Sequence, residues 1–266
     1  MKNEENNNDY LLNIVSDADV ADVKKALDSG ADIKTRDDLG YTALIMASSK
    51  GKTDTVKLLI ENNADINEKD DLGYTALMRA AINNHMEIIK LLLNSRAKVN
   101  IHSKDGWNAL SWAAFYGRTA IVKILLDNGA DINSKTKNGQ TPLMKASGEG
   151  RTETVKFLID KCADLNIQNN EGKTALIRIS NWVHVSLIEK YTNIARLLIG
   201  KGADLDLSTN HGMTALMYAS SSGHNNVVKL LIDAGANIQT KDNNGNTALD
   251  YAVIKKNNKI VELLKN

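Results

Sequence analysis

Residues 70–81 read Asp-Asp-Leu-Gly-Tyr-Thr-Ala-Leu-Met-Arg-Ala-Ala, and the central Gly-x-Thr-Ala-Leu string of this stretch returns along almost the whole chain. The spacing is 33 residues, except for one step of 40. A fixed period of this length is typical of proteins built from stacked structural repeats. Copies with Ala or Pro after the threonine start at Gly40, Gly73, Gly139, Gly172, Gly212 and Gly245, and a copy with asparagine for threonine starts at Gly106.

Each repeat contains the signals that start and end two short helices. The threonine, such as Thr75, precedes an apolar stretch and is predicted to cap a first helix. Pro142, the only proline, follows such a threonine and falls at the first helical position, where its missing N–H does no harm. A second helix is predicted at apolar blocks such as Val56-Lys-Leu-Leu-Ile. Glycines such as Gly30 in Gly-Ala-Asp then supply the left-handed residue that ends it.

This pattern resembles the ankyrin repeat, whose motif Asp-x-x-Gly-x-Thr-Pro-Leu-His-x-Ala-Ala is matched by residues 70–81 apart from Ala76 for proline and Met78 for histidine. The resemblance implies an all-α fold, an ankyrin-repeat solenoid of stacked helix-turn-helix units with β-hairpin-like loops. Arg96 and Cys162 depart from the glycine that favours the left-handed position, so we expect the centre of the array to be less stable. We expect a single domain, 1–266, with units 7–39 (N-terminal capping unit), 40–72, 73–105, 106–138, 139–171, 172–211 with a seven-residue insertion, 212–244 and 245–266 (C-terminal capping unit).

The composition excludes several classes of protein. The 266 residues carry a net charge of +1, from 33 basic and 32 acidic side chains, so the basic excess of a typical nucleic-acid binder is missing. A single cysteine excludes an intrachain disulfide. Residues 1–10 have no apolar core of a secretory signal, and the sequence has no run of 18 apolar residues. We therefore expect an elongated cytoplasmic monomer that binds no nucleic acid and does not insert into a membrane.

The sequence contains none of the common motifs of catalysis or cofactor binding. The five histidines include no pair three or four residues apart, which a helical metal site would need. We find no phosphate-binding loop, no dinucleotide fingerprint and no nucleophile elbow. The carboxylates recur with the 33-residue period, which indicates a feature of every repeat and not a unique acid–base pair. We expect no catalytic residue, no metal and no cofactor, and therefore no enzyme.

The resemblance implies a partner-binding concave face, formed by hairpin tips and by the outward side of the first helices. In three consecutive units, the positions expected to be exposed there carry six of the twelve aromatic residues. Aromatic residues and arginine are enriched at binding hot spots. The alternative is that Trp112 and Phe115 pack against neighbouring helices and only fill the groove. The candidate partner-binding residues are Tyr41, Met46, Tyr74, Arg79, Trp107, Trp112, Phe115, Tyr116, Lys145 and Tyr218.

The function that these observations favour is a non-enzymatic protein–protein interaction scaffold that binds a partner protein on its concave face. The alternatives are a regulatory or inhibitory subunit of an enzyme, or an effector delivered into a host cell. A column of basic residues on the second helices, which includes Lys57, could bind a polyanion, but carboxylates four residues on, such as Glu61, favour a solvated face. The insertion either packs locally or offers an apolar contact through Trp182, Val183, Val185, Leu187 and Ile188.

Overall fold

The computed structural model describes residues 9–16, 19–181 and 187–265. Trp182, Val183 and Val185 of the expected insertion lie outside these residues. The chain divides into two compact units. The first comprises residues up to 113 together with 118–131, and the second comprises residues 114–117 together with the chain from 132 onward. Each unit is described by itself.

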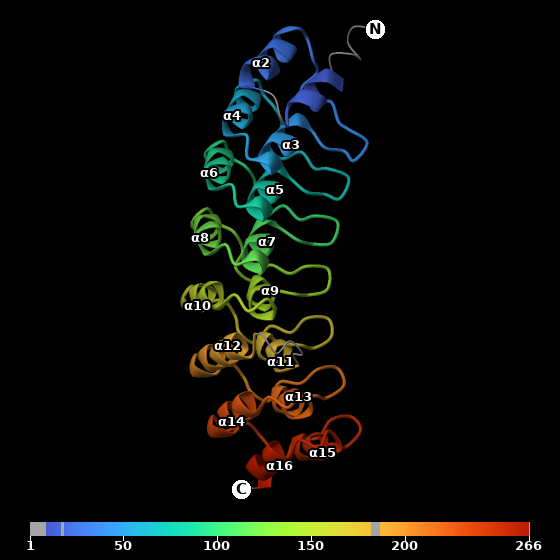
Figure 1. Cartoon of the computed structure of the whole chain (residues 1–266), viewed down its shortest axis with the longest axis vertical. Helices are drawn as coiled ribbons and strands as arrows, with labels where there is room; N and C mark the ends of the chain where they lie inside the picture. Colours follow the sequence, from blue (N-terminus) through green and yellow to red (C-terminus); the bar gives the residue numbers. More distant parts are fainter. Residues whose placement is uncertain (1–8, 17–18, 182–186, 266) are drawn as a thin grey trace. The chain divides into compact units, whose positions relative to one another are not determined.

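The first unit consists of two layers of short helices (Figure 1). Residues 9–14 are helical and precede the numbered elements. In one layer α3 packs against α5; in the other α2 packs on α4, α4 on α6, and α6 on α8. The helix α7, Ala109–Tyr116, is divided between the two units after Ala113. The remaining helices are α2 (Val20–Asp28), α3 (Ala43–Lys50), α4 (Thr53–Glu61), α5 (Ala76–Asn83), α6 (Met86–Asn94) and α8 (Thr119–Asp127).

The second unit repeats this arrangement. In one layer α9, α11, α13 and α15 pack in succession, and in the other α10, α12, α14 and α16 do so. The repeat with the insertion keeps its place, because α11 lies between α9 and α13 while α12 lies between α10 and α14. The helices are α9 (Pro142–Gly148), α10 (Thr152–Asp160), α11 (Ala175–Ser180), α12 (Ile188–Gly200), α13 (Ala215–Ser222), α14 (Asn225–Asp233), α15 (Ala248–Ile254) and α16 (Asn258–Lys265).

The extra length of the repeat 172–211 is found partly in its second helix. The helix α12 has 13 residues where α10 has nine, which adds about one turn. The described first helix, α11, has six residues and is not lengthened. Ile188, at the start of α12, is exposed.

The predicted helix starts are confirmed. The side-chain oxygen of each capping threonine accepts a hydrogen bond from the backbone N–H three residues later, as between Thr75 and Met78 at 3.3 Å. Pro142 occupies the first turn of α9. Asn108 replaces threonine in one repeat and caps α7 in the same way, because its Oδ1 accepts from Ser111 N at 2.8 Å. The capping threonines are Thr42, Thr75, Thr141, Thr174, Thr214 and Thr247.

The left-handed residues after the second helices are also where the sequence predicts them. Gly30 and Gly129 have φ of 90° and 83°. Arg96 and Cys162 hold the equivalent position with φ of 67° and 61°. A side chain with a Cβ is strained in this conformation by about 1–2 kcal/mol, so both residues reduce the stability of their repeats.

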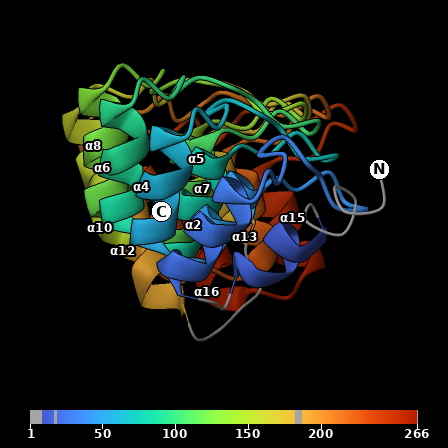
Figure 2. The ribbon, with the colours of Figure 1, turned by 90° about the horizontal axis from the view of Figure 1, so that it is seen from above.

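Polar loops return the chain from each second helix to the next first helix. In each unit these loops project on the side away from the second helices (Figure 2). Among the described residues the only β-type pairings are the isolated bridges Arg36–Thr42 and Ser208–Thr214, so the loops are hairpin-like without forming strands. The core lies between the helices and is made of periodic aliphatic side chains, such as Leu44, Leu77 and Leu110.

Asparagine side chains in the loops join neighbouring repeats within each unit. In the first unit the Oδ1 of Asn67 accepts from Lys98 N at 2.8 Å, and that of Asn100 accepts from Asp131 N at 2.9 Å. In the second unit Asn133 and Asn166 accept in the same way from the backbone of the following repeat. These bonds fix the spacing of the loops, which carry the candidate residues Tyr41, Tyr74 and Trp107.

Candidate functional site

Every loop that precedes a first helix contains one side chain that holds the loop closed. This residue, the loop acceptor, accepts a hydrogen bond from the backbone N–H four residues later, which belongs to the residue after the hairpin glycine. For Asp70, Oδ1 accepts from Tyr74 N at 2.8 Å and from Leu72 N at 2.9 Å. The bond fixes the position from which the side chain after the glycine projects. The loop acceptors are Asp37, Asp70, Ser103, Thr136, Asn169, Thr209 and Asp242.

In two loops the acceptor is a carboxylate whose second oxygen bonds a side chain of the following first helix, nine residues further along the chain. Asp70 Oδ2 accepts from Arg79 Nη2 at 2.5 Å, with the Asp70 side chain only 1% exposed. Asp242 Oδ2 accepts from the hydroxyl of Tyr251 at 2.5 Å in the second unit. Burial disfavours the Asp242 anion, but hydrogen bonds from Tyr251, Asn246 and Asn244 outweigh it and lower the pKa of that carboxyl. The loop acceptor therefore also positions a side chain of the candidate surface.

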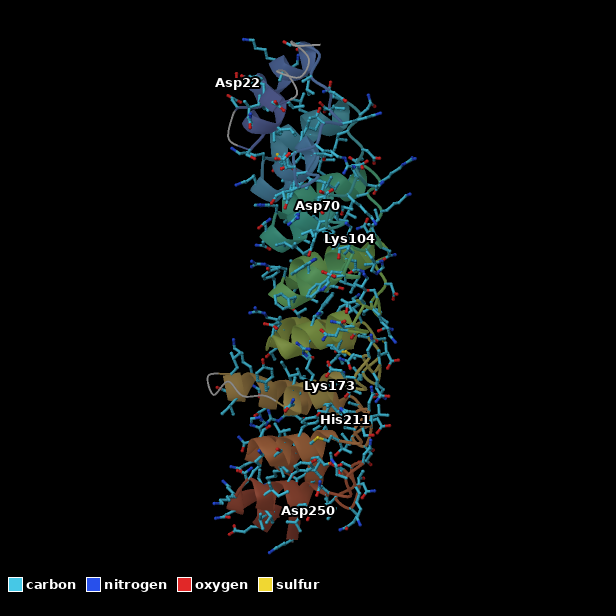
Figure 3. The ribbon with its side chains drawn as sticks, turned by 90° about the vertical axis from the view of Figure 1, so that its right-hand side faces the viewer. Asp22, Asp70, Lys104, Lys173, His211 and Asp250 are labelled. Atoms are coloured by element: carbon cyan, nitrogen blue, oxygen red, sulfur yellow. The ribbon has the colours of Figure 1, made fainter. Side chains whose placement is uncertain are left out.

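Arg79 lies against two tyrosine rings of the first unit. Its guanidinium carbon is 4.7 Å from the ring centre of Tyr41 and 4.3 Å from that of Tyr74. Both distances are within the range of a cation–π contact. Burial raises the pKa of the Tyr41 hydroxyl, and the positive charge of Arg79 opposes that rise. Asp70, labelled in Figure 3, holds this cation from the loop side.

Two tryptophans continue the same surface. The rings of Trp107 and Trp112 stack with their centres 4.1 Å apart, and Trp112 lies 5.9 Å from the Tyr74 ring in a tilted arrangement. The contacts therefore run without a break through Tyr41, Arg79, Tyr74, Trp112 and Trp107, all in the first unit. We call these five residues the aromatic layer. Each is half-buried, so the layer both packs on the helices and presents a face to solvent.

This arrangement corrects one expectation about the loop residues. Trp107 and Tyr74 each follow a hairpin glycine, so from the sequence alone both are expected at the tips of the hairpins, outside the shared core. Both are half-buried, and Trp107 rests on Trp112 of α7 because the loop acceptor Ser103 holds Trp107 close to the helix. The side chains of Trp107 and Tyr74 therefore pack against the protein and are partly exposed to solvent at the same time. Met46, on α3, is half-buried as well, nine residues after Asp37.

The other candidate residues belong to the second unit. Phe115 and Tyr116 form an edge-to-face pair with ring centres 5.1 Å apart, and both are half-buried. Tyr218 lines a cavity of about 310 Å³ together with Lys173 and His211, which are labelled on neighbouring loops in Figure 3. The expected exposure of Lys145 is wrong, because its side chain is buried, with 9% of its surface exposed. Burial, together with the nearby charge of Arg178, lowers the pKa of Lys145 to about 8.

The same unit contains a second cavity, of about 260 Å³, which the repeat pattern does not indicate. Arg178, one of its lining residues, stands at the same repeat position as Arg79 but is not among the candidate partner-binding residues. We call this space the Arg178 cavity. Its lining residues are Gln140, Gly148, Asn169, Glu171, Lys173, Arg178 and Asn181.

The basic residues of the column on the second helices lie on a solvated face, as the contacts of two of them show. Lys24 pairs with Asp28 at 2.9 Å, and Lys57 approaches Glu61 at 4.0 Å, both four residues apart. The histidine at the start of α6 has a structural role, because His85 Nε2 is hydrogen-bonded to Ser49 O at 3.1 Å. Over the residues with described structure, no three His, Cys, Asp or Glu side chains converge as a metal site would need.

Comparison with known families agrees with the repeat pattern. A family model described as ankyrin repeats (3 copies) matches residues 11–105, 63–136, 110–189 and 183–266. The chain therefore belongs to the ankyrin repeat family, and its fold is the all-α ankyrin solenoid. Ankyrin repeats are generally modules of protein–protein interaction and are typically not enzymes. No curated protein matches the chain. None of the helices in the described ranges is long and apolar enough to cross a membrane.

Proposed function

We propose that the protein is a non-enzymatic scaffold that binds a partner protein through the aromatic layer on the side of the first helices. The observation that carries this proposal is the unbroken series of contacts from Tyr41 through Arg79 to Trp107. Tryptophan, tyrosine and arginine dominate the energetics of protein interfaces. A helical core does not need these residues there, because Gln140, Lys173 and Asn246 occupy the Trp107 position in other repeats.

The layer is organised before any partner arrives. Arg79 is fixed by the buried Asp70, and the Asp70 carboxylate is itself held by two backbone N–H groups. Trp107 is fixed by its stacking on Trp112. Ordering a flexible side chain at an interface costs about 0.5–1.5 kcal/mol, so a surface that is already ordered binds with a smaller loss of entropy. This feature supports a binding role for the layer.

The proposal also covers the cellular compartment and the oligomeric state of the protein. We place it in a reducing compartment such as the cytoplasm, because Cys162 is an exposed free thiol. We also propose that the chain acts as a monomer that presents one binding surface to one partner.

The experiment is a comparative capture from the native cell with the whole chain as bait. The bait is compared with the double variant Trp107→Ala/Tyr74→Ala and with the control Lys57→Ala, whose side chain lies on the exposed face of α4. We expect a protein that is retained by the unchanged chain and by the control and is lost from the double variant. Equal capture by all three, with equal helicity by circular dichroism, would contradict the proposal.

A further inference from the structure

Arg79 and Arg178 occupy the same position of their repeats, but only Arg79 is paired with a carboxylate of its own loop. Each arginine lies nine residues after its loop acceptor, and Arg79 is paired with Asp70. For Arg178 the loop acceptor is Asn169, whose Oδ1 is already occupied by Glu171 N at 3.0 Å and Lys173 N at 2.8 Å. The neutral amide leaves Arg178 without the counter-ion that Arg79 receives from its own loop.

Within the described ranges, no carboxylate forms an ion pair with Arg178. Both Arg178 Nε and Arg79 Nε are buried without a hydrogen-bond partner there, so the two arginines differ in the contact that Arg79 Nη2 makes with Asp70. Glu171 is the one acidic residue of the cavity lining; its Oε2 is paired with Lys173 Nζ at 2.6 Å, and the charge of Arg178 helps to lower the pKa of this carboxyl. A buried guanidinium N–H without an acceptor loses its hydration without compensation.

The space beside Arg178 depends on a glycine in α9. A Cβ placed on Gly148 would lie 2.1 Å from Arg178 Nε, so any larger residue would displace the guanidinium. At the same repeat position the chain has Ile82 and Phe115 elsewhere. Gly148, the last residue of α9, therefore leaves the room that the Arg178 guanidinium occupies beside the cavity.

The cavity has an excess of positive charge. Arg178 and Lys173 line it, and Lys145 is close enough for the charge of Arg178 to lower its pKa. Two carboxylates act in the same region, since Glu149 raises the pKa of Lys145 and Glu171 is paired with Lys173. Three cations against two carboxylates leave one positive charge to be neutralised, which suits a singly charged anion better than a doubly charged phosphate.

We propose that the Arg178 cavity binds a carboxylate side chain, glutamate or aspartate, of the partner polypeptide. The ligand carboxylate takes the place that Asp70 has at Arg79, and it accepts hydrogen bonds from the Arg178 guanidinium. This inference rests on the proposed function, because it assigns a second contact to the same partner. It would give the interaction a requirement for an acidic residue, in addition to the apolar contact of the aromatic layer.

The test uses a small probe and the full-length protein, so that it does not depend on a known partner. The probe is N-acetyl-glutamate amide, titrated at low salt into ¹⁵N-labelled protein while the arginine Nε–H signals are followed by NMR. Arg178→Gln and Arg79→Gln assign the two signals. We expect the Arg178 signal to shift in a saturable manner. The Arg79 signal should stay in place, because the Arg79 guanidinium is already paired with Asp70 through Nη2. N-acetyl-glutamine amide should bind at least about tenfold more weakly, because it lacks the charge.

The variant Asn169→Asp supplies the carboxylate from within the chain. Aspartate holds this loop position in three other repeats, so we expect the fold to tolerate it. The aspartate should occupy Arg178 and abolish the response to N-acetyl-glutamate amide. An unchanged response in Asn169→Asp, or equal shifts of Arg79 and Arg178 in the unchanged protein, would overturn the proposal. A stronger response to N-acetyl-phosphoserine amide would overturn the assignment to a carboxylate. The indole signals of Trp107 and Trp112 report on the aromatic layer separately, so failure of either site is distinguishable.

Discussion

Asp70 and Arg79 are nine residues apart and form a 2.5 Å ion pair that joins a loop to the first helix of the same repeat. The Asp70 side chain is 1% exposed and that of Arg79 is 17% exposed, so the pair is shielded from water on the loop side. Removing one partner of such a pair leaves the other charge without compensation. The pair therefore connects the stability of the repeat with the orientation of the aromatic layer.

Replacing Asp70 by asparagine should weaken this repeat through loss of charge alone. The asparagine keeps an oxygen for the backbone N–H groups, as Asn169 does, but gives Arg79 no anion. We expect the free energy of unfolding in urea to fall by about 1.5–3 kcal/mol, the value of a hydrogen bond to a charged group. Asp37→Asn is the matched control, because Asp37 makes the same loop bonds and the residue nine positions later is the uncharged Met46. Equal losses in the two variants would show that the ion pair contributes nothing.

Trp107→Ala should affect both stability and binding. The stacked contact with Trp112 is worth about 0.5–1.5 kcal/mol beyond the area that it buries, so we expect a measurable fall in the free energy of unfolding. Together with Tyr74→Ala, it should weaken binding of the purified partner by about 2–4 kcal/mol, measured by calorimetry. Asn246→Ala, at the equivalent position in the second unit and outside the lining of the Arg178 cavity, should leave the affinity nearly unchanged. An unaltered affinity of the double variant would make the layer structural only.

Cys162→Gly should stabilise the protein. The residue has φ of 61°, and glycine removes the strain of a Cβ in the left-handed region. Part of this gain is lost because glycine makes the unfolded chain more flexible, so we expect about 0.5–1 kcal/mol in a urea titration. Gly129→Ala is the reciprocal control. A Cβ there would meet no atom within 4 Å, so any loss of stability comes from the backbone at φ of 83°.

The burial of Lys145 should make stability depend on alkaline pH. Its pKa is lowered from 10.5 to about 8 in the folded protein, so the unfolded state binds more protons between these values. Stability from this group is therefore lowest below pH 8 and rises as the pH increases towards 10.5. Lys145→Met should remove that rise, which is measured as the difference in unfolding free energy between the variant and the unchanged chain. An identical pH profile would show that the ammonium remains hydrated.

The helix boundaries were predictable because their signals are local. Thr75 caps the helix that follows it, and Pro142 needs only its own neighbours to fit the first turn. The loop acceptors were not predictable from the repeat pattern, because four residue types (Asp, Asn, Ser and Thr) occupy this position in different repeats. The burial of Lys145 depends on side chains of the next repeat, which periodicity does not specify. Arg178 is in register with Arg79 and precedes the insertion, but the cavity beside it is also lined by Gln140 and Gly148 of the preceding repeat, which the period of one residue column does not reveal.

The loop acceptors assign loop conformation and surface chemistry to different residues. One oxygen of Asp37, Asp70 or Asn169 bonds the loop backbone, while the residue nine positions later lies on the first helix. If the proposed function is correct, substitution at these two positions should change what one repeat binds and leave its loop geometry unchanged. A library varied only at the two positions would then sample new ligands without repeated selection for folding.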